Sequence, residues 1–305
     1  MPRLLEKNYK NMPELPEVHT IVADLKRFIP GLKIKDVWTD ILAFKKIKKD
    51  VVGEKIISVE RRGKNILIHL SPNPKDQIFG KTILVHQKMT GHLMYGKWVK
   101  EKSGWKSVLP GPMRDDPGNR FIHLLFFLSN NKHLALCDMR KFASVVVLPE
   151  KIVKEKLEKL GPEPFDKNFN IKKFSENIKR KTGKIKTVLM DQGVIAGIGN
   201  IYADEILWEA GVHPLKISSK LKESEIKKIY RAIKPVLKRA IKARGSSYID
   251  YRDAQGKKGR YQEMQNAYGL KGKKCKKRGC NGIIEKIVIG GRSAHFCPKH
   301  QTKYD

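Results

Sequence analysis

The apolar residues of this chain change their spacing near residue 150. Between Lys33 and Leu148 they form short alternating runs separated by turn residues, a pattern typical of half-buried β-strands. From Glu150 onward, and earlier between Glu17 and Phe28, they recur at helical spacing. Many short strands favour a β-sandwich. The chain has 305 residues, more than the ~100–200 residues of a typical single domain, so we expect a second domain. The sequence therefore predicts a sandwich with a leading helix, followed by an α-rich domain.

Three segments interrupt these patterns. Residues 98–119 are rich in Gly, Pro and charge, so we expect a long surface loop there. Residues 161–164, Gly-Pro-Glu-Pro, are the expected linker between the domains. Pro235 lies inside the last long helical pattern and should kink that helix.

Metal-binding side chains gather near the C-terminus with the spacing Cys275-x4-Cys280-x16-Cys297-x2-His300. Two close ligand pairs suit one tetrahedral zinc ion, and four protein ligands make such a site structural rather than catalytic. The β pattern between the pairs is broken at Gly290-Gly291, which predicts a hairpin with Arg292 at its tip. The alternative to a zinc site is that the Cys/His spacing arose by chance. The alternative for Arg292 is that it is simply a solvated turn residue.

The charge balance indicates the class of partner. The chain has 64 Lys and Arg against 31 Asp and Glu, a net charge of +33, which points to a polyanion and most simply to nucleic acid. A lysine-rich solvated surface is the alternative. No apolar run approaches the ~18 residues of a membrane span, and the charged start lacks a secretion signal. We therefore expect a cytoplasmic protein without a membrane partner.

Three further motifs each have a simple structural explanation when taken alone. Residues 12–18, Met-Pro-Glu-Leu-Pro-Glu-Val, can be an acidic helix start, and residues 61–64, Arg-Arg-Gly-Lys, a solvated hairpin turn. Residues 197–205, Gly-Ile-Gly-Asn-Ile-Tyr-Ala-Asp-Glu, can be a turn between helices. Alternatively, the glycines let an anion approach the helix N-terminus at Asn200.

Two further motifs join these three, namely Asp-Met-Arg-Lys-Phe at 138–142 and the C-terminal Cys/His hairpin. In order and approximate spacing, the five motifs resemble those of the formamidopyrimidine-DNA glycosylase (Fpg/Nei) family. The resemblance spans residues 12–300 and implies an α+β multidomain fold. Its implied parts are an extension at 1–11, a catalytic β-sandwich domain at 12–150, a helix-two-turns-helix domain at 165–262 and a zinc finger at 266–305. We expect a monomer in a bacterial-type cytoplasm, associated with the nucleoid.

The resemblance implies a bifunctional base-excision repair enzyme, a glycosylase and abasic-site lyase acting on double-stranded DNA with oxidised bases or abasic sites. Pro13 corresponds to the nucleophile and Glu14 to the carboxylate that assists base loss and ring opening. Lys64 corresponds to the proton donor of β-elimination, and Arg292 to the donor to phosphate in the final elimination. A secondary amine with a pKa in the α-amino range of ~7.7–8.0 is partly unprotonated at neutral pH. An ordinary lysine, with a pKa near ~10.4, is almost wholly protonated.

The resemblance also implies a set of DNA contacts. Met89, Arg140 and Phe142 correspond to the residues that fill the gap left by an everted base. The implied phosphate contacts are His86, Lys141, Asn200 and, near residues 181–184, either Lys181 or Lys184. We also expect Arg61 and Arg62 to face phosphates.

The segment from Ser246 to Gly259 resembles the oxidised-purine branch, in which this loop closes over an everted 8-oxoguanine. We therefore expect removal of 8-oxoguanine and formamidopyrimidines. A Nei-like enzyme for oxidised pyrimidines and a non-catalytic damaged-DNA-binding zinc-finger protein are the alternatives. The chain departs from the family in using three cysteines and one histidine for zinc, and in having Phe121 where a phosphate-contacting histidine is usual; His123 lies two residues away.

Eleven residues precede Met12. While they are attached, the Pro13 nitrogen is a tertiary amide and cannot form an iminium. Pro2 is followed by Arg3 rather than by a carboxylate. We therefore expect the active protein to begin at Pro13, through translation from Met12 and methionine removal or through processing.

Overall fold

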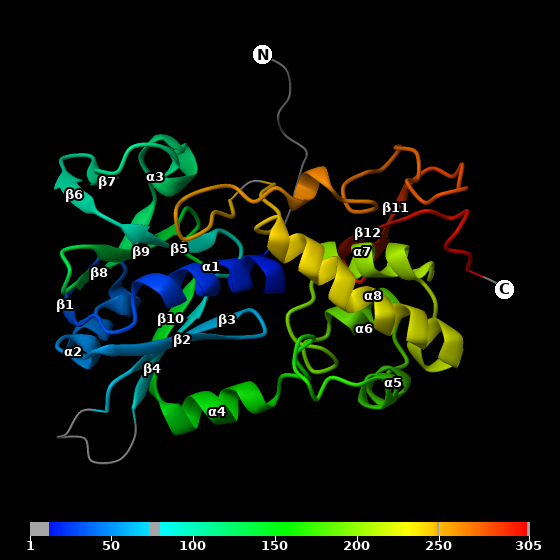
Figure 1. Cartoon of the computed structure of the whole chain (residues 1–305), viewed down its shortest axis with the longest axis horizontal. Helices are drawn as coiled ribbons and strands as arrows, with labels where there is room; N and C mark the ends of the chain where they lie inside the picture. Colours follow the sequence, from blue (N-terminus) through cyan, green and yellow to red (C-terminus); the bar gives the residue numbers. More distant parts are fainter. Residues whose placement is uncertain (1–11, 73–79, 249, 304–305) are drawn as a thin grey trace.

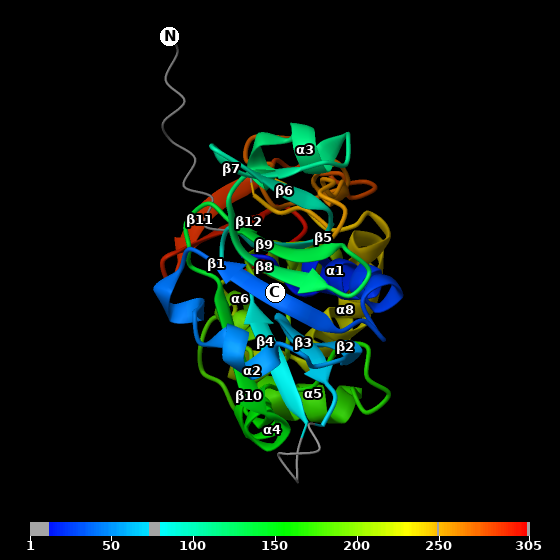
Figure 2. The ribbon, with the colours of Figure 1, turned by 90° about the vertical axis from the view of Figure 1, so that its left-hand side faces the viewer.

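A computed structural model describes residues 12–72, 80–248 and 250–303; the expected extension at 1–11 lies outside the described residues. The N-terminal half contains two stacked four-stranded antiparallel sheets (Figures 1 and 2), which confirms the predicted sandwich. In spatial order the first sheet consists of β1 (Ile34–Thr39), β8 (Ile122–Leu128), β9 (His133–Asp138) and β5 (Gly91–Gly96). The second consists of β10 (Ser144–Pro149), β4 (Lys81–His86), β3 (Asn65–Leu70) and β2 (Ile56–Arg62).

The helix α1 (Leu15–Phe28) belongs to two hydrophobic cores. Its residues Val18, Ile21 and Leu25 are fully buried in the core between the two sheets. Its first residue, Leu15, is buried instead in the core of the helical domain. The helix therefore starts against the helical domain and runs from there into the sandwich (Figure 1). Short connections complete the sandwich, namely α2 (Ile47–Val51) and a 3₁₀ turn at Leu42–Phe44.

The expectation of a long loop at residues 98–119 is wrong. The segment forms a hairpin, β6 (Trp98–Glu101) with β7 (Gly104–Ser107), followed by the helix α3 (Pro112–Asp115) and a 3₁₀ turn at Pro117–Asn119. Trp98 and Met113 are buried in a cluster that also holds Cys137. These elements are too short for a periodic signal, and a few large apolar side chains anchor them. Burial raises the pKa of the Cys137 thiol to about 12, in keeping with a core thiol.

The C-terminal half is helical, as predicted. The helix α4 (Glu150–Glu158) lies against β4 and β10 of the sandwich. Beyond the linker lie α5 (Ile171–Lys179), α6 (Ile185–Met190), α7 (Asn200–Ala210) and α8 (Glu223–Lys242), with further 3₁₀ turns at Ser218–Lys220 and Tyr261–Glu263. The helix α8 continues through Pro235. Within the described ranges, no helix has the length and apolar character that crossing a membrane would require.

A two-stranded hairpin, β11 (Glu285–Ile289) with β12 (Arg292–Phe296), follows the helices. Its turn is Gly290-Gly291, and both glycines have positive φ values of 56° and 72°, a conformation that L side chains rarely adopt. Strand β12 packs against α7, so α7 lies between this hairpin and α8. The predicted fold class, with sandwich, helical domain and C-terminal hairpin, is confirmed.

Candidate active site

A pocket between the sandwich, α7 and the C-terminal hairpin brings together residues that are far apart in the sequence. Glu14, Lys64, His86, Asn200 and Arg292, all singled out from the sequence, line it. The other lining residues are Met12, Asn65, Leu160, Met190, Gln192 and Gly199. Pro13 is buried, and its neighbours in the sequence, Met12 and Glu14, both line the pocket.

Glu14 is bound by the N-terminus of α7. Its carboxylate accepts hydrogen bonds from the backbone N–H groups of Gly199 (2.6 Å), Ile201 (2.9 Å) and Tyr202 (3.4 Å). A helix N-terminus is a natural anion site, and here the anion is the protein's own carboxylate. A Cβ atom at position 199 would lie 2.5 Å from the Glu14 carboxylate carbon and 2.7 Å from the Lys64 Nζ, so a larger residue there would displace both groups.

The environment of Glu14 and Lys64 favours the neutral form of each group. Burial raises the pKa of Glu14 to about 7, although the positive charge of Lys64 acts in the opposite direction. Burial lowers the pKa of Lys64, although the charges of Glu14 and Glu17 act in the opposite direction. Lys64 is only 8% exposed and lies in the tight turn between β2 and β3. The pocket therefore holds a carboxyl that titrates near neutral pH beside a lysine whose pKa is lowered from its ordinary value.

The expectation that Arg61 and Arg62 face phosphates is wrong. The Arg61 guanidinium donates to Glu163 (2.5 Å) and to the carbonyl of Gly63 (2.8 Å). Arg62 donates to the carbonyl of Leu160 (2.7 Å) and lies 3.4 Å from Glu163. Glu163 belongs to the interdomain linker, so both arginines hold the linker against the β2–β3 turn.

Glu17 is a site residue that the motif analysis did not single out. Its carboxylate accepts hydrogen bonds from the backbone N–H of Glu14 (2.9 Å), the hydroxyl of Tyr202 (2.6 Å) and the N–H of Ser246 (2.7 Å). Burial raises its pKa. A glutamate three residues after a helix N-cap is the signature of a capping box, and that spacing was available in the sequence. Glu17 fixes the first turn of α1 against the helical domain.

Among the three expected gap-filling residues, Arg140 contacts both Met89 and Phe142. The Arg140 guanidinium lies 4.6 Å from the Phe142 ring centroid, and its Nη1 lies 3.8 Å from the Met89 sulfur. Phe142 is 50% exposed, which leaves its ring available for stacking. Lys141, between Arg140 and Phe142, has a φ of 55°, so the turn that presents all three side chains is strained.

The expected phosphate contacts have different surroundings. Burial lowers the pKa of His86 to about 4, so this imidazole is neutral at pH 7. Lys181 pairs with Asp191 at 2.9 Å and does not line the pocket. Asn200 begins α7 and donates weakly to the Ser293 hydroxyl (3.4 Å). His123 is bound to Asp40 at 2.9 Å, so its Nδ1 is engaged within the protein.

The predicted metal ligands form one cluster. The ligand atoms of Cys275, Cys280, Cys297 and His300 all lie within 4.8 Å of one another. The other ring nitrogen of His300, Nε2, lies 3.1 Å from the carbonyl of Trp208, and such an outer hydrogen bond usually orients a metal-binding histidine. Three thiolates and one imidazole can hold one metal ion with no position left for a substrate.

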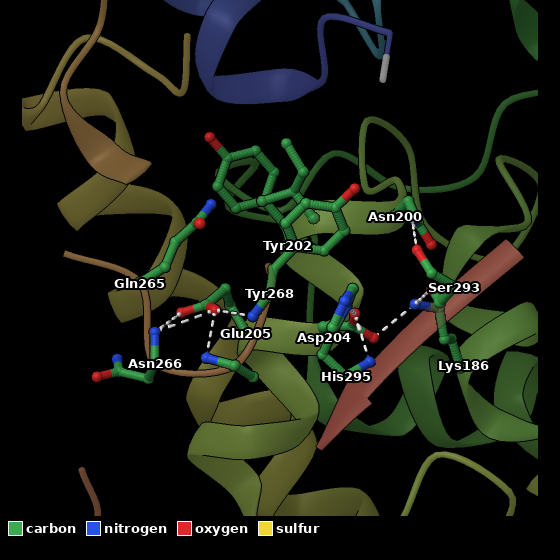
Figure 3. Close-up of polar contacts among 12 residues, drawn as sticks. Lys186, Asn200, Tyr202, Asp204, Glu205, Gln265, Asn266, Tyr268, Ser293 and His295 are labelled. Carbon is green, nitrogen blue, oxygen red and sulfur yellow. Dashed lines mark hydrogen bonds and ion pairs between the residues drawn. The ribbon is translucent and has the colours of Figure 1, made fainter. Parts of the chain in front are cut away.

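A buried network joins the hairpin to the helical domain (Figure 3). Lys186 of α6 donates to the Asp204 carboxylate of α7 and to the Ser293 carbonyl of β12, both at 2.5 Å. The other Asp204 oxygen accepts from the N–H of His295 (2.9 Å) and lies 3.1 Å from its Nδ1. The Lys186 and Asp204 side chains are 1% and 0% exposed. The strand that carries Arg292 is thereby fixed to α6 and α7.

The next residue of α7, Glu205, holds the chain that leads to the metal cluster. Its carboxylate accepts from the backbone N–H groups of Asn266 (3.0 Å), Ala267 (2.9 Å) and Tyr268 (2.9 Å), as Figure 3 shows. It does not line the pocket, so its role is structural.

A β-sandwich and a helical domain that enclose this pocket, with a C-terminal hairpin at its rim, define the class of two-domain helix-two-turns-helix enzymes. Family models support this class. The N-terminal domain of formamidopyrimidine-DNA glycosylase matches residues 12–145, and the H2TH domain of that enzyme matches residues 160–251. The chain belongs to the formamidopyrimidine-DNA glycosylase family.

Individual relatives agree with this assignment. The chain is 37% identical over 299 residues to the formamidopyrimidine-DNA glycosylase of Oceanobacillus iheyensis, covering 95% of this chain and 98% of the relative. It is 34% identical to that of Bacillus subtilis, covering 96% and 100%. Among solved structures it is similar to the Lactococcus lactis Fpg in complex with abasic-site DNA. That match has a TM-score of 0.79 and 33% identity, and covers 95% of this chain and 100% of the other.

The raised pKa of Glu14 predicts a pH-dependent effect of Glu14→Gln on stability. The folded state binds the Glu14 proton more tightly than the unfolded state does, so the free energy of unfolding falls as pH rises from about 4.5 to about 7. Glu14→Gln removes this dependence. The difference in the free energy of unfolding, variant minus unaltered protein, should therefore rise by about 3 kcal/mol between pH 4.5 and pH 7. Urea unfolding at several pH values measures this difference. Glu155→Gln, on exposed α4, is the control, and a pH-independent difference for Glu14→Gln would contradict the prediction.

The buried network predicts a large difference between two neighbouring lysines. Lys186→Met leaves the Asp204 carboxylate buried without its partner and should lower the free energy of unfolding by about 3–5 kcal/mol. Lys184→Met, at an exposed position two residues earlier, should change it by less than about 0.5 kcal/mol. Urea denaturation of both variants makes the comparison. Equal small effects would show that the pair contributes little to holding the hairpin.

Proposed function

We infer that this protein is a base-excision repair DNA glycosylase and abasic-site lyase that acts on double-stranded DNA. The observation that carries this inference is the buried pair Glu14 and Lys64 beside Pro13, in the interdomain pocket of a chain from this family. Solved relatives are described as complexes with abasic-site and Fapy-dG DNA, which fits a positively charged chain that holds damaged duplex in its cleft.

Chemistry begins at the Pro13 nitrogen. With its amine free, the nitrogen lone pair attacks the sugar C1′, forming an N–C1′ bond as the glycosidic bond breaks; the base leaves with the bonding electron pair and takes up a proton, which the N–H of the attacking amine supplies overall. Glu14 gives its proton to the ring oxygen O4′, so that the ring opens and a cationic iminium remains at C1′. A carboxyl with a pKa of about 7 holds a proton for this step at neutral pH, which an ordinary carboxyl would not.

The iminium then makes strand cleavage possible. It acidifies the C2′ proton; when a base takes that proton, its electron pair forms the C2′–C3′ double bond and the C3′–O bond breaks, which releases the 3′ phosphate, with Lys64 as the proton donor of this β-elimination. Arg292, at the hairpin turn, donates to the second phosphate as it leaves in the δ-elimination. Met89, Arg140 and Phe142 fill the gap left by the everted base, and Arg140 satisfies the orphaned cytosine. His86, Lys141 and Asn200 contact phosphates, and Lys181, which lies outside the pocket lining, is a further candidate.

Oxidised purines, 8-oxoguanine and formamidopyrimidine, are the proposed substrates. The names of the relatives support this choice, as does the segment from Ser246 to Gly259. In the structure Tyr251, Arg252 and Asp253 of this segment are buried, and Arg252 pairs with Asp116 of the sandwich at 2.7 Å. Removal of an oxidised pyrimidine is a second candidate, because one solved relative is described in complex with oxidised-pyrimidine DNA.

Borohydride trapping tests both the function and the nucleophile. Protein that begins at Pro13 should form a covalent adduct with an 8-oxoguanine duplex, because its secondary amine is free. Protein that retains residues 1–12 should form none, because its Pro13 nitrogen is an amide. Mass spectrometry must verify the N-terminus of each protein.

Undamaged duplex is the control for trapping, and thymine glycol duplex tests the pyrimidine alternative. Equal trapping by a verified long chain would move the nucleophile elsewhere, with Pro2 and Lys64 the first candidates. Stronger trapping on thymine glycol than on 8-oxoguanine would reverse the proposed substrate preference. Absence of an adduct from the Pro13 form on every damaged duplex would contradict the enzymatic function.

We propose zinc as the metal of the C-terminal cluster, held by Cys275, Cys280, Cys297 and His300. The ion stabilises the hairpin and takes no part in the chemistry. His300→Ala should lower zinc retention during dialysis against a chelator and weaken DNA binding, whereas the neighbouring Lys299→Ala should retain the ion. Elemental analysis measures the zinc, and unchanged retention in His300→Ala would show that the fourth ligand is another group.

A further inference from the structure

The outer face of α8 carries an uninterrupted row of cations. Between Ile226 and Arg244 the chain has no Asp or Glu. At the helical 3.6-residue period, five cations in this stretch fall within one narrow stripe. We call this the α8 basic stripe, and it consists of Lys227, Arg231, Lys234, Lys238 and Lys242.

The stripe is not neutralised within the protein. The acidic residues of α8 lie in its first turn, where Glu223 pairs with Lys179 and Glu225 pairs with Lys216. In the described part of the chain, no carboxylate lies within 4.0 Å of a stripe cation. Like charges three and four residues apart destabilise a helix, so this arrangement is unfavourable unless an anion binds it.

A second exposed helix shows that the stripe is not simply what a lysine-rich composition places on every helix surface. The exposed helix α4 has three lysines, Lys151, Lys154 and Lys156, balanced by Glu150, Glu155 and Glu158. Both helices are amphipathic and face solvent. Only α8 has a single sign of charge beyond its first turn, so α4 is a matched internal control.

The stripe points away from the active-site pocket. The opposite face of α8, with Ile229, Ile233 and Val236, is buried in the helical core. The helix α7 lies between α8 and β12, and the pocket is at the N-terminus of α7. In Figure 2, α8 and the β11–β12 hairpin are on opposite sides of the molecule. A duplex in the pocket therefore leaves the stripe open.

The chemistry of the face favours a nucleic acid over a protein partner. Among the described residues, no exposed large apolar side chain lies on α8, so the face lacks the buried anchors typical of protein interfaces. The fifteen helical steps from Lys227 to Lys242 span about 22 Å, roughly two-thirds of a turn of B-DNA. Duplex DNA offers one negative charge per ~1.7 Å of its axis. The stripe therefore suits a polyanion whose phosphates it contacts along the backbone. Such contacts do not depend on the base sequence.

We propose that the α8 basic stripe is a second, sequence-independent binding surface for duplex DNA. One protein molecule then holds a damaged duplex in the pocket and an undamaged segment on α8. Such bivalent holding raises the local concentration of DNA and lets the protein pass between segments without full release. The choice of duplex rests on the proposed function, but the second surface does not depend on catalysis.

The test uses the protein that begins at Pro13, saturated with a short duplex containing an uncleavable abasic analogue. A second, differently labelled undamaged duplex is then titrated, and stoichiometry is measured by analytical ultracentrifugation. The unaltered protein should bind both duplexes. The affinity for the second should fall with salt at a log–log slope of about −4 to −5, as expected for about five phosphates.

The stripe variant replaces all five cations with Gln. It should lose at least tenfold in affinity for the second duplex, yet keep its affinity for the abasic duplex and its trapping yield. The matched control K151Q/K154Q/K156Q on α4 should keep both sites. A Lys→Arg variant at the four stripe lysines preserves charge and should also keep both, which separates charge from folding.

Three outcomes would overturn the proposal. These are unchanged second-duplex binding in the stripe variant, equal loss in the α4 control, and displacement of the second duplex by a polyglutamate peptide more readily than by unlabelled duplex. The last outcome would indicate an acidic protein as the partner. Loss of trapping with second-duplex binding intact would count against the proposed enzymatic function and leave this surface standing.

Discussion

The hydrogen bonds between the Glu14 carboxylate and the N-terminus of α7 are the interaction on which the rest of the structure depends. Three backbone N–H groups from the helical domain bind a side chain that precedes the first helix of the sandwich. The same contact region includes the N–H of Leu15 donating to the carbonyl of Gly197 at 3.0 Å. Because a buried carboxylate without donors is costly, the two domains can close only in the register that supplies them. Closing the domains and building the site are therefore one event.

The helix α7 extends this principle along its length. Each of its buried carboxylates, Asp204 and Glu205, binds a different part of the C-terminal segment, while its N-terminus binds Glu14. Buried charges add little net stability compared with apolar packing, but they penalise every arrangement that leaves them unpaired. Three such contacts on one helix fix the sandwich, the hairpin strand and the chain before the metal cluster relative to one another. The position of Arg292 is thus set by α6 and α7 as well as by its own turn.

Features with a local cause could be predicted from the sequence. Alternation specified the sandwich strands, ligand spacing specified the Cys/His cluster, and the glycine pair specified the hairpin turn. Features that depend on distant partners could not be predicted. Arg61 and Arg62 resemble a solvated turn until Glu163, about a hundred residues later, is brought beside them. Likewise, the glycines before Asn200 indicated an anion site, but no local pattern shows that Glu14 supplies the anion.

That intramolecular anion constrains how DNA can be held. The N–H groups at the start of α7, which in many proteins bind a ligand phosphate, are already engaged by Glu14. Phosphates entering the pocket must instead find side-chain donors at its rim, among them His86, Asn200 and Arg292. The helix N-terminus is left to act on the carboxyl itself, where its donors and Lys64 partly offset the burial that favours the protonated form. The balance leaves Glu14 titrating near neutral pH, where a group that must give up a proton and later recover it is most useful.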